Sequence, residues 1–234
     1  MAGADGHPGG AAASDGGAGD RGVAAVSFDL FGTLVGVDRP DDPAAAVAAA
    51  LAERGVAVPD DWAAAYAEPQ FEYAPGVERP LHHHVAAALA SRADRPARAF
   101  VDDAVAAVRA AFDRPVRTRP GAVAAVAALA ERGPVGVCSN CSVPGLVARS
   151  LDRSALDRAA FDAVTTSVGC GRRKPARGAF ADVAAGLGVP VDRLVHVGDD
   201  PATDGGVERY GGRFVAVDDV PLADLPAHAE ARWG

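Results

Sequence analysis

Short apolar runs, each followed by a polar residue, are the feature of this sequence that most restricts its fold. Asp29 directly follows the first run, VAAVSF, and Ser139 directly follows the second. Continuous apolar runs of this length are typical of parallel strands that are buried on both faces. We therefore expect five strands, the third of them the weakest, at 23–28, 135–138, 161–165, 194–197 and 214–217.

Helical patterns separate the later runs. Phe180, Val183 and Leu187 recur on one helical face, and an alanine-rich stretch at 121–132 ends at Gly133. Strands that alternate with helices predict an α/β fold built on a doubly wound parallel sheet. The composition, with 49% hydrophobic and 23% charged residues, is that of a globular protein.

The first two runs are separated by about 100 residues, far more than a crossover connection needs. We interpret this stretch as an all-helical insertion at 37–115, so that the α/β core comprises 23–36 and 116–234. The Gly/Ala/Asp-rich residues 1–22 are expected to be a disordered tail. The helical segments expected within the insertion are 43–54, 61–68, 81–92 and 97–112.

Charge and cysteine content narrow the partners and the compartment. The net charge of −8 argues against binding to nucleic acid or to an anionic membrane surface, and no apolar run is long enough to span a bilayer. Cys138 and Cys141 form a C-x-x-C pair, but no second pair completes a zinc site, so we expect reduced thiols. The N-terminus lacks the basic and apolar regions of a signal peptide, which predicts a cytoplasmic protein.

Polar side chains gather where the expected strands end. Open parallel sheets bind ligands beyond the carboxyl ends of their strands, so these side chains should share one crevice with Lys174, the only lysine of the chain. Several carboxylates brought together would repel one another, and a hard cation such as Mg²⁺ would relieve that repulsion. The residues concerned are Asp29, Thr33, Ser139, Asn140, Asp199, Asp200 and Asp204.

The order and spacing of these residues resemble the haloacid dehalogenase-like hydrolase superfamily over nearly all of 23–220. The resemblance implies a Rossmann-like core, a small-molecule substrate, and a helical insertion that acts as a mobile cap. It rests on four motifs, which are FDLFGTL at 28–34, CSN at 138–140, Lys174–Pro175 followed by Phe180, and VGDD at 197–200 followed by Asp204.

The resemblance assigns a role to each catalytic candidate. Asp29 would be the nucleophile, and Thr33 would orient the loop and the reacting group. Ser139 would donate a hydrogen bond to a substrate oxygen, with Asn140 lining the same pocket. Lys174 would neutralise charge on Asp29 and on the transferred group.

A Mg²⁺ site is also implied by the resemblance. The ion would be held by Asp29, the main-chain carbonyl of Phe31 and Asp199, with Asp200 or Asp204 either binding it or bracing it through water. It would screen the nucleophile from an anionic substrate.

Phe31 departs from the family's phosphatases, which usually carry a second aspartate there as general acid and base. General acid–base catalysis contributes about 10²–10⁴-fold, and a phenyl ring cannot transfer a proton. The family's haloacid dehalogenases carry an aromatic residue at this place.

We favour a Mg²⁺-dependent phosphatase of a small phosphorylated metabolite. The alternatives are a metal-independent 2-haloacid dehalogenase that acts on a halogenated substrate, and a non-catalytic relative that binds a phosphorylated ligand.

The helical insertion should select the substrate and could replace the missing acid. His82, His83 and His84 are consecutive there, and we hypothesise that one of them reaches the leaving oxygen, since histidine titrates near neutrality. The candidates for substrate contact are Tyr66, Phe71, Tyr73, Arg79 and the three histidines.

Overall fold

A five-stranded, fully parallel sheet forms the core of the computed structural model, which describes residues 23–233. The tail predicted at 1–22 lies outside the described residues. The first strand is central in the order β5-β4-β1-β6-β7, and the order reverses between β1 and β6, which is where open α/β sheets bind ligands. The strands are β1 (Ala25–Phe28), β4 (Val135–Ser139), β5 (Ala163–Thr166), β6 (Leu194–Gly198) and β7 (Arg213–Ala216).

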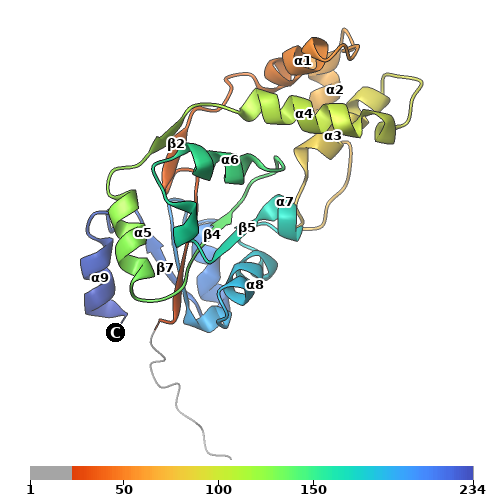
Figure 1. Ribbon diagram of the computed structural model, residues 1–234. Helices are drawn as coiled ribbons and strands as arrows, with labels where there is room; N and C mark the ends of the chain where they lie inside the picture. The colour runs from red at the N-terminus through yellow and green to blue at the C-terminus, as the bar shows by residue number, and fades with distance from the viewer. Residues whose placement is uncertain (1–22, 234) are drawn as a thin grey trace, which may run out of the picture.

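Alternate residues of the strands pack into two separate cores, one on each face of the sheet. Val26 and Phe28 belong to the larger core, whereas Ala25 belongs to the smaller one. Figure 1 shows helices on both sides of the sheet, and this confirms the doubly wound α/β prediction. The larger core includes α5 (Ala122–Ala130) and α9 (Leu225–Arg232), and the smaller one includes α8 (Arg177–Gly186) and the 3₁₀ helix η4 (Asp204–Tyr210).

Several elements of the core were not predicted, because they are very short or carry too few apolar residues to show a clear pattern. Most of them connect strands, and α6 follows the loop that leaves β4. Together with α9, these elements are α6 (Leu146–Arg153), α7 (Ser167–Cys170), and the 3₁₀ helices η2 (Arg158–Ala160) and η3 (Val191–Arg193).

A layer of helices lies beyond one end of the sheet (Figure 1). All four predicted helical segments of the insertion are present, and the last opens with a 3₁₀ turn. Their apolar faces bury Leu51, Val85 and Val108 at 0% exposure. No helix among residues 23–233 is both long enough and apolar enough to cross a bilayer. The elements are α1 (Pro43–Glu53), α2 (Trp62–Ala67), α3 (Leu81–Ala90), η1 (Ala97–Phe100) and α4 (Val101–Phe112).

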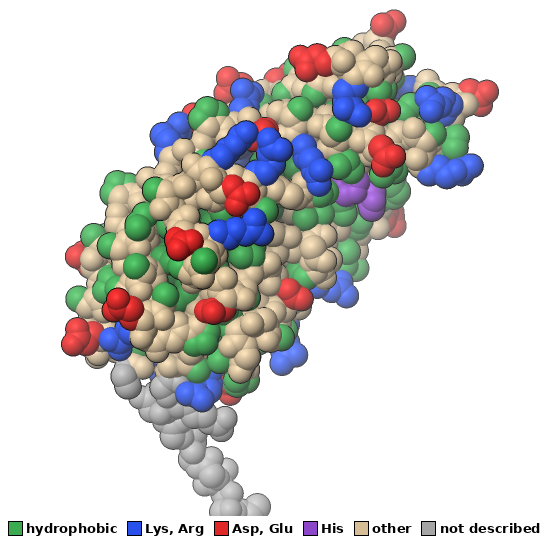
Figure 2. Space-filling view, viewed as in Figure 1, with side chains coloured by type: hydrophobic (Ala, Val, Ile, Leu, Met, Phe, Trp, Pro, Cys, Tyr) green, Lys and Arg blue, Asp and Glu red, His purple; other side chains and the backbone are tan. Residues whose placement is uncertain are grey.

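Two separate links join these helices to the core. The first is an antiparallel ribbon of β2 (Val35–Val37) and β3 (Val116–Thr118), and the predicted domain boundaries fall within it. The second is a run of backbone hydrogen bonds between 76–81 and the core, including Glu78 N to Gly171 O at 3.0 Å. The division into core and cap remains a prediction, but the insertion is tied down at two places. In Figure 2 the molecule is elongated, and acidic and basic side chains are interspersed over the visible face.

Candidate active site

The loop after β1 delivers Asp29 to the carboxyl edge of the sheet. Its main-chain N–H donates to the carbonyl of Val197 at 2.8 Å, which fastens the tip of β1 to β6. Gly32 then turns the chain with φ +95°, and a Cβ at this position would lie 2.3 Å from Oδ2 of Asp199. Only glycine lets the loop approach Asp199 so closely. The Arg119 guanidinium donates to the carbonyl of Gly32 and holds the turn from the other side.

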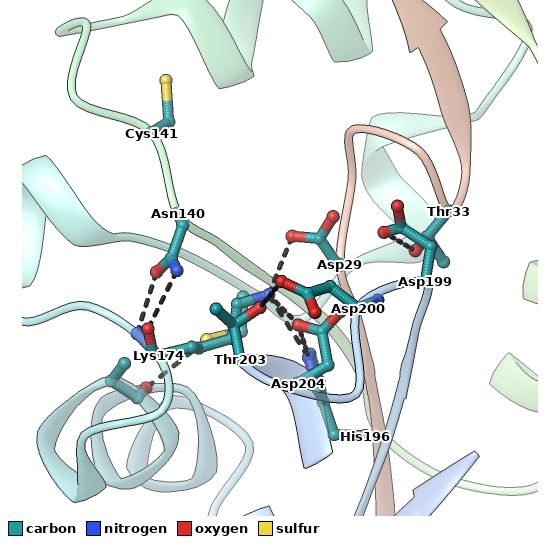
Figure 3. A network of polar contacts seen from close by, with 12 residues as sticks. Asp29, Thr33, Asn140, Cys141, Lys174, His196, Asp199, Asp200, Thr203 and Asp204 are labelled. Carbon is teal, nitrogen blue, oxygen red and sulfur yellow. Dashed lines mark hydrogen bonds and ion pairs between the residues drawn. The ribbon is translucent and has the colours of Figure 1, made fainter. Parts of the chain in front are cut away.

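Lys174 lies between two carboxylates at the floor of the site (Figure 3). Its Nζ is 2.8 Å from Oδ1 of Asp29 and 2.6 Å from Oδ1 of Asp204, and the residue is only 3% exposed. Burial opposes the charge, but Asp29 and Asp204 raise the pKa of Lys174 above its usual range, so the amine is an ammonium at neutral pH. The structure thus brings together three residues that are up to 175 positions apart.

Asp29 has two other carboxylates in its surroundings, and the single ammonium of Lys174 does not balance all three negative charges. Burial raises the pKa of Asp29 to about 6, because lost hydration and the carboxylates of Asp204 and Asp199 outweigh the attraction of Lys174. The second oxygen of Asp29 has no hydrogen-bond partner within 23–233, whereas Oδ1 accepts from Lys174. The carboxylate therefore presents one uncommitted oxygen.

His196 and Ser27 extend this cluster, and the sequence analysis missed both. His196 Nε2 lies 3.1 Å from Oδ1 of Asp204, and its Nδ1 lies 2.8 Å from Oγ of Ser27. Burial lowers the pKa of His196 to about 4, so the ring is neutral. The contact of Nε2 with the acceptor Asp204 favours a proton on this nitrogen, although Nζ of Lys174, a donor, lies 3.4 Å from the same atom. The hydroxyl of Ser27 then donates to Nδ1. Both residues are the polar members of otherwise apolar strands, and they are partners in the β1–β6 register, which was the available signal.

Asp204 is fixed by several donors at once. Oδ1 accepts from Lys174 and His196, and Oδ2 accepts from the main-chain N–H of Asp200 at 3.1 Å. Burial alone would raise the pKa of Asp204, but the hydrogen bonds and charges of His196 and Lys174 hold it below its usual range. With both oxygens occupied, Asp204 is placed to brace Lys174.

Ser139 and Asn140 leave the end of β4 in different directions. Ser139 is 2% exposed, and its Oγ has no hydrogen-bond partner among the described residues. Leaving a buried hydroxyl unpaired costs about 1–3 kcal/mol, so this oxygen is available to a bound molecule. The amide of Asn140 instead grips the main chain of Lys174, donating to its carbonyl at 3.0 Å and accepting from its N–H at 2.8 Å.

The two acidic residues that follow β6 directly, Asp199 and Asp200, have different hydrogen-bond partners. Asp199 is exposed, and its Oδ1 accepts from the hydroxyl of Thr33 at 3.0 Å, so Thr33 orients this carboxylate. Asp200 accepts from the N–H of Ala202 and the hydroxyl of Thr203, at 2.9 and 3.0 Å. Asp200 thus shapes the loop, while Asp199 is left to face the site.

The oxygen-rich surroundings of Asp29 suit a hard cation. In the part of the chain that the structure describes, no three or more His, Cys, Asp and Glu side chains are arranged to hold a metal ion. The set implied by the sequence comprises Asp29, Asp199 and the main-chain carbonyl of Phe31, with Asp200 or Asp204 as a further ligand or a brace. Both oxygens of Asp204 already accept from other donors, which fits a brace better than a ligand. An all-oxygen set is the kind that Mg²⁺ prefers. The close approach of the Gly32 turn to Asp199 keeps the loop carrying Phe31 beside that carboxylate.

A cavity of about 650 Å³ lies between the core and the helical insertion. Phe31 lines this cavity, at the position where the family's phosphatases usually carry an aspartate. A smaller hollow of about 380 Å³, lined by 23–26 and Trp233 among others, contains none of the predicted site residues. The larger cavity is lined by Phe31, Asn140, Arg173 and Asp199 of the core and by Tyr66, Arg79 and Leu81 of the insertion, among others.

None of the three consecutive histidines is among the residues that line this cavity, and neither are Asp29, Ser139 and Lys174. His84 Nε2 lies 2.6 Å from the carbonyl oxygen of Tyr66, and the ring centroids of His82 and His83 are 4.2 Å apart. The hypothesis that one of them supplies the missing proton donor has no support in this geometry. Of the other candidates for substrate contact, Tyr66 and Arg79 line the cavity, whereas Phe71 and Tyr73 do not.

The fold and the cluster together define a class of protein with a Rossmann-like α/β core, a carboxylate at the tip of its first strand and a helical insertion that follows this strand in the sequence. A family model for haloacid dehalogenase-like hydrolases matches residues 23–206, and the chain belongs to this family. The family and the α/β fold predicted from the sequence are thereby confirmed.

Several solved structures share the fold. A 2-haloacid dehalogenase from Pseudomonas syringae pv. Tomato DC3000 is 19% identical, with a TM-score of 0.60 over 91% of this chain and 100% of that one. The protein CbbY from Rhodobacter sphaeroides, in complex with phosphate, is 19% identical, with a TM-score of 0.54 over 83% and 85%. The putative HAD-hydrolase YfnB from Bacillus subtilis, bound to magnesium, is 16% identical, with a TM-score of 0.51 over 90% of this chain and 99% of that one. A comparison with curated proteins found no match.

Proposed function

We propose that the protein is a Mg²⁺-dependent phosphatase of a small phosphorylated metabolite, which reacts through an aspartyl-phosphate on Asp29. The observation that supports this most is the charge balance of the site. The carboxylates of Asp29 and Asp204 share one ammonium, that of Lys174, while the charge of Asp199 also acts on Asp29 and His196 is neutral. A divalent cation would balance the excess negative charge and let an anionic phosphate approach.

In the first step, the uncommitted oxygen of Asp29 attacks phosphorus. A bond forms between Asp29 and phosphorus while the bond from phosphorus to the substrate oxygen breaks. The orphan hydroxyl of Ser139 would donate to a phosphoryl oxygen, and Lys174 would balance charge that develops on the transferred group. The departing oxygen takes its proton from water, since Phe31 has none to give.

In the second step, water attacks the phosphorus of the aspartyl-phosphate. The carboxylate of Asp29 is regenerated, inorganic phosphate is released, and the surplus proton passes to solvent. Asn140 and Asp204 keep Lys174 in place during both steps, through its main chain and its side chain. The helical insertion would act as a cap that excludes bulk water from the cavity.

Mg²⁺ would be held by Asp29, the carbonyl of Phe31 and Asp199, with Asp204 as a brace. When bound, it supplies charge neutralisation to the nucleophile and to the phosphate. Thr33 orients Asp199 for this task through its 3.0 Å hydrogen bond.

A 2-haloacid dehalogenase is the second candidate, because Phe31 lines the cavity where a phosphatase of this family needs an acid. Asp29 would attack the carbon that bears the halogen, and halide would leave with the bonding electrons and without a proton. Water would then hydrolyse the ester on Asp29, giving the 2-hydroxy acid. This route needs no metal.

One set of assays separates the candidates. We expect Mg²⁺-dependent phosphate release from an aryl phosphate, abolished by EDTA and by Asp29→Asn. Halide release from a 2-haloacid in the presence of EDTA would instead support the dehalogenase. Binding of phosphorylated ligands with neither product released would contradict both and leave the non-catalytic relative.

A further inference from the structure

We propose that Arg79 and Arg173 form a second anion-binding subsite, so that the substrate carries another oxyanion, a carboxylate or a second phosphate, besides its reacting group. Both arginines line the same cavity as Phe31, Asn140 and Asp199, although one comes from the helical insertion and the other from the core. The inference rests on the proposed reaction at Asp29 only for the identity of the reacting group.

The subsite is organised by Glu78, whose carboxylate is buried between the two arginines. Its side chain is 1% exposed, and its main-chain N–H donates to the carbonyl of Gly171. Oε1 accepts from the main-chain N–H of Arg79 at 2.8 Å, and Arg173 Nη1 donates to Oε2 at 3.1 Å and to Oε1 at 3.3 Å. Removing one partner of such a buried pair is costly, so Glu78 fixes the guanidinium of Arg173, whereas it fixes only the main chain of Arg79.

Arg173 is held by one edge and leaves the other free. Nη1 makes all three of its side-chain hydrogen bonds, the third to the hydroxyl of Ser142 at 3.0 Å. Nη2 and Nε have no acceptor among residues 23–233, and the side chain is 36% exposed. A guanidinium has a planar fork of donors that matches an oxyanion. Glu78 and Ser142 therefore orient Arg173 without using the donors that an anion would need.

Arg79 supplies the uncompensated positive charge. Its guanidinium lies over the ring of Tyr73, with Cζ 5.6 Å from the ring centroid, and no described carboxylate pairs with it. Glu78 balances the charge of Arg173 but contacts Arg79 only through the main chain. The pair thus offers one net positive charge with two sets of directional donors.

The position of the subsite fixes what it can recognise. Arg173 directly precedes Lys174 in the chain, and the cavity of about 650 Å³ that both arginines line reaches Phe31, Asn140 and Asp199, although Asp29, Ser139 and Lys174 are not themselves among its lining residues. A substrate with two anionic groups would meet Ser139 and Lys174 with one of them and the arginines with the other. A substrate with one anion would leave the free edge of Arg173 unpaired.

Matched substrates test the inference. Phosphate release is measured for a phosphorylated 2-hydroxy acid and its methyl ester, and for a short alkane bisphosphate and the matching monophosphate. We expect kcat/KM to be about 10- to 100-fold higher for the doubly anionic member of whichever pair fits, since charge-assisted hydrogen bonds are strong. The substrate pair with the larger ratio of kcat/KM values shows whether the second anionic group is a carboxylate or a phosphate.

Three variants assign the effect to these residues. Arg79→Ala and Arg173→Lys should each lower kcat/KM about 10-fold or more for the doubly anionic substrate and less than about 2-fold for its partner. Glu78→Gln, which acts through Arg173, should raise KM for the doubly anionic substrate alone, whereas a merely structural role would affect both substrates alike. Arg54→Ala is the control, because Arg54 is also on the insertion but pairs with Asp103 on its surface.

The outcomes separate the subsite from the proposed reaction. If an aryl phosphate is hydrolysed but neither pair shows a preference, the subsite is wrong and the reaction stands. If no phosphate is released from any substrate, calorimetry on Asp29→Asn with the phosphorylated acid and the bisphosphate decides. Binding that Arg79→Ala weakens supports the subsite, and no binding overturns it.

Discussion

Lys174 is the residue on which the charge balance of the site depends. We predict that Lys174→Met lowers the free energy of unfolding by about 3–5 kcal/mol at pH 7.5, because Asp29 and Asp204 are left buried without their counter-ion. Urea denaturation measures this. Adding Asp29→Asn to the variant should restore part of the loss, since one of the two carboxylates is then neutral. Equal stabilities of wild type and Lys174→Met would contradict the ion-pair geometry.

Ser139 should show the opposite relation between stability and activity. Its buried Oγ has no partner among the described residues, so Ser139→Ala removes a desolvated hydroxyl and should leave stability unchanged or raise it by up to about 1 kcal/mol. Turnover should nevertheless fall by about 10- to 100-fold, because the substrate loses a donor. Thermal unfolding and phosphate release give the two readings. A loss of stability equal to that of a core truncation would mean that Oγ has a partner in solution.

The three thiols should differ in their reaction with iodoacetamide. Burial raises the pKa of Cys138 to about 12 and that of Cys141 to about 11, so neither forms appreciable thiolate at pH 8. Burial also raises the pKa of Cys170, but this residue is half-exposed and should be modified first. Mass spectrometry of native and urea-treated protein checks the order. Rapid modification of Cys138 in the native state would contradict its burial.

Single residues at strand ends could be predicted from the sequence, but their supporting partners could not. Asp29, Ser139 and Lys174 follow apolar runs or precede a helix, and that position is visible in one dimension. Ser27 and His196 lie within strands, where their pairing appears only once the register is known. Glu78 and Arg173 are 95 positions apart, and no local pattern links them.

At the scale of elements, the turn after β1 depends on a glycine that no other residue can replace. We predict that Gly32→Ala lowers stability by about 1–3 kcal/mol and abolishes turnover, because its φ of +95° is strained for alanine and the new Cβ would collide with Asp199. Gly36→Ala in β2 is the matched control. A Cβ there would have only the carbonyl of Arg117 within 4 Å, at 3.9 Å, so its stability should stay the same or rise slightly. Chemical denaturation of the two variants provides the comparison, and equal losses would show that the turn tolerates a side chain.

Elements with a clear apolar pattern were predictable and the others were not. The strands and the helices of the insertion carry apolar patterns that extend over four to twelve residues. The ribbon of β2 and β3 has three residues in each strand, which is too few for a period, and its pairing joins segments about 80 positions apart. The pairing of β2 with β3, which connects the insertion to the core, is therefore visible only in the structure.

At the scale of the whole molecule, the insertion is joined to the core by two links on either side of the cavity. The second link consists of the N–H groups of Glu78, Leu81 and Arg173, which donate to Gly171, Ser142 and Gly76 respectively. If the insertion moves as a cap, these three hydrogen bonds must open together, whereas those within the sheet need not. Their amides would then report on the motion.

We predict that inorganic phosphate with Mg²⁺ slows hydrogen exchange at the amides of Glu78, Leu81 and Arg173, by about 100-fold at 100 times its Kd, because a ligand that binds only the closed form suppresses opening. The amide of Asp162, which donates to Val135 within the sheet, is the control and should change little. Exchange is followed by NMR. Unchanged rates at all three amides, with phosphate binding shown by calorimetry, would contradict coupling between the cavity and this link.

The single lysine has a practical consequence for spectroscopy. Because no other position of the 234 carries this amino acid, cells fed with lysine enriched in ¹⁵N at the side chain would label the protein at one nitrogen, Nζ of Lys174. Buried between Asp29 and Asp204, that nitrogen is shielded from rapid proton exchange with water, so its resonance should be observable. One signal, obtained without altering the sequence, would follow metal addition, substrate binding and product release at the centre of the molecule.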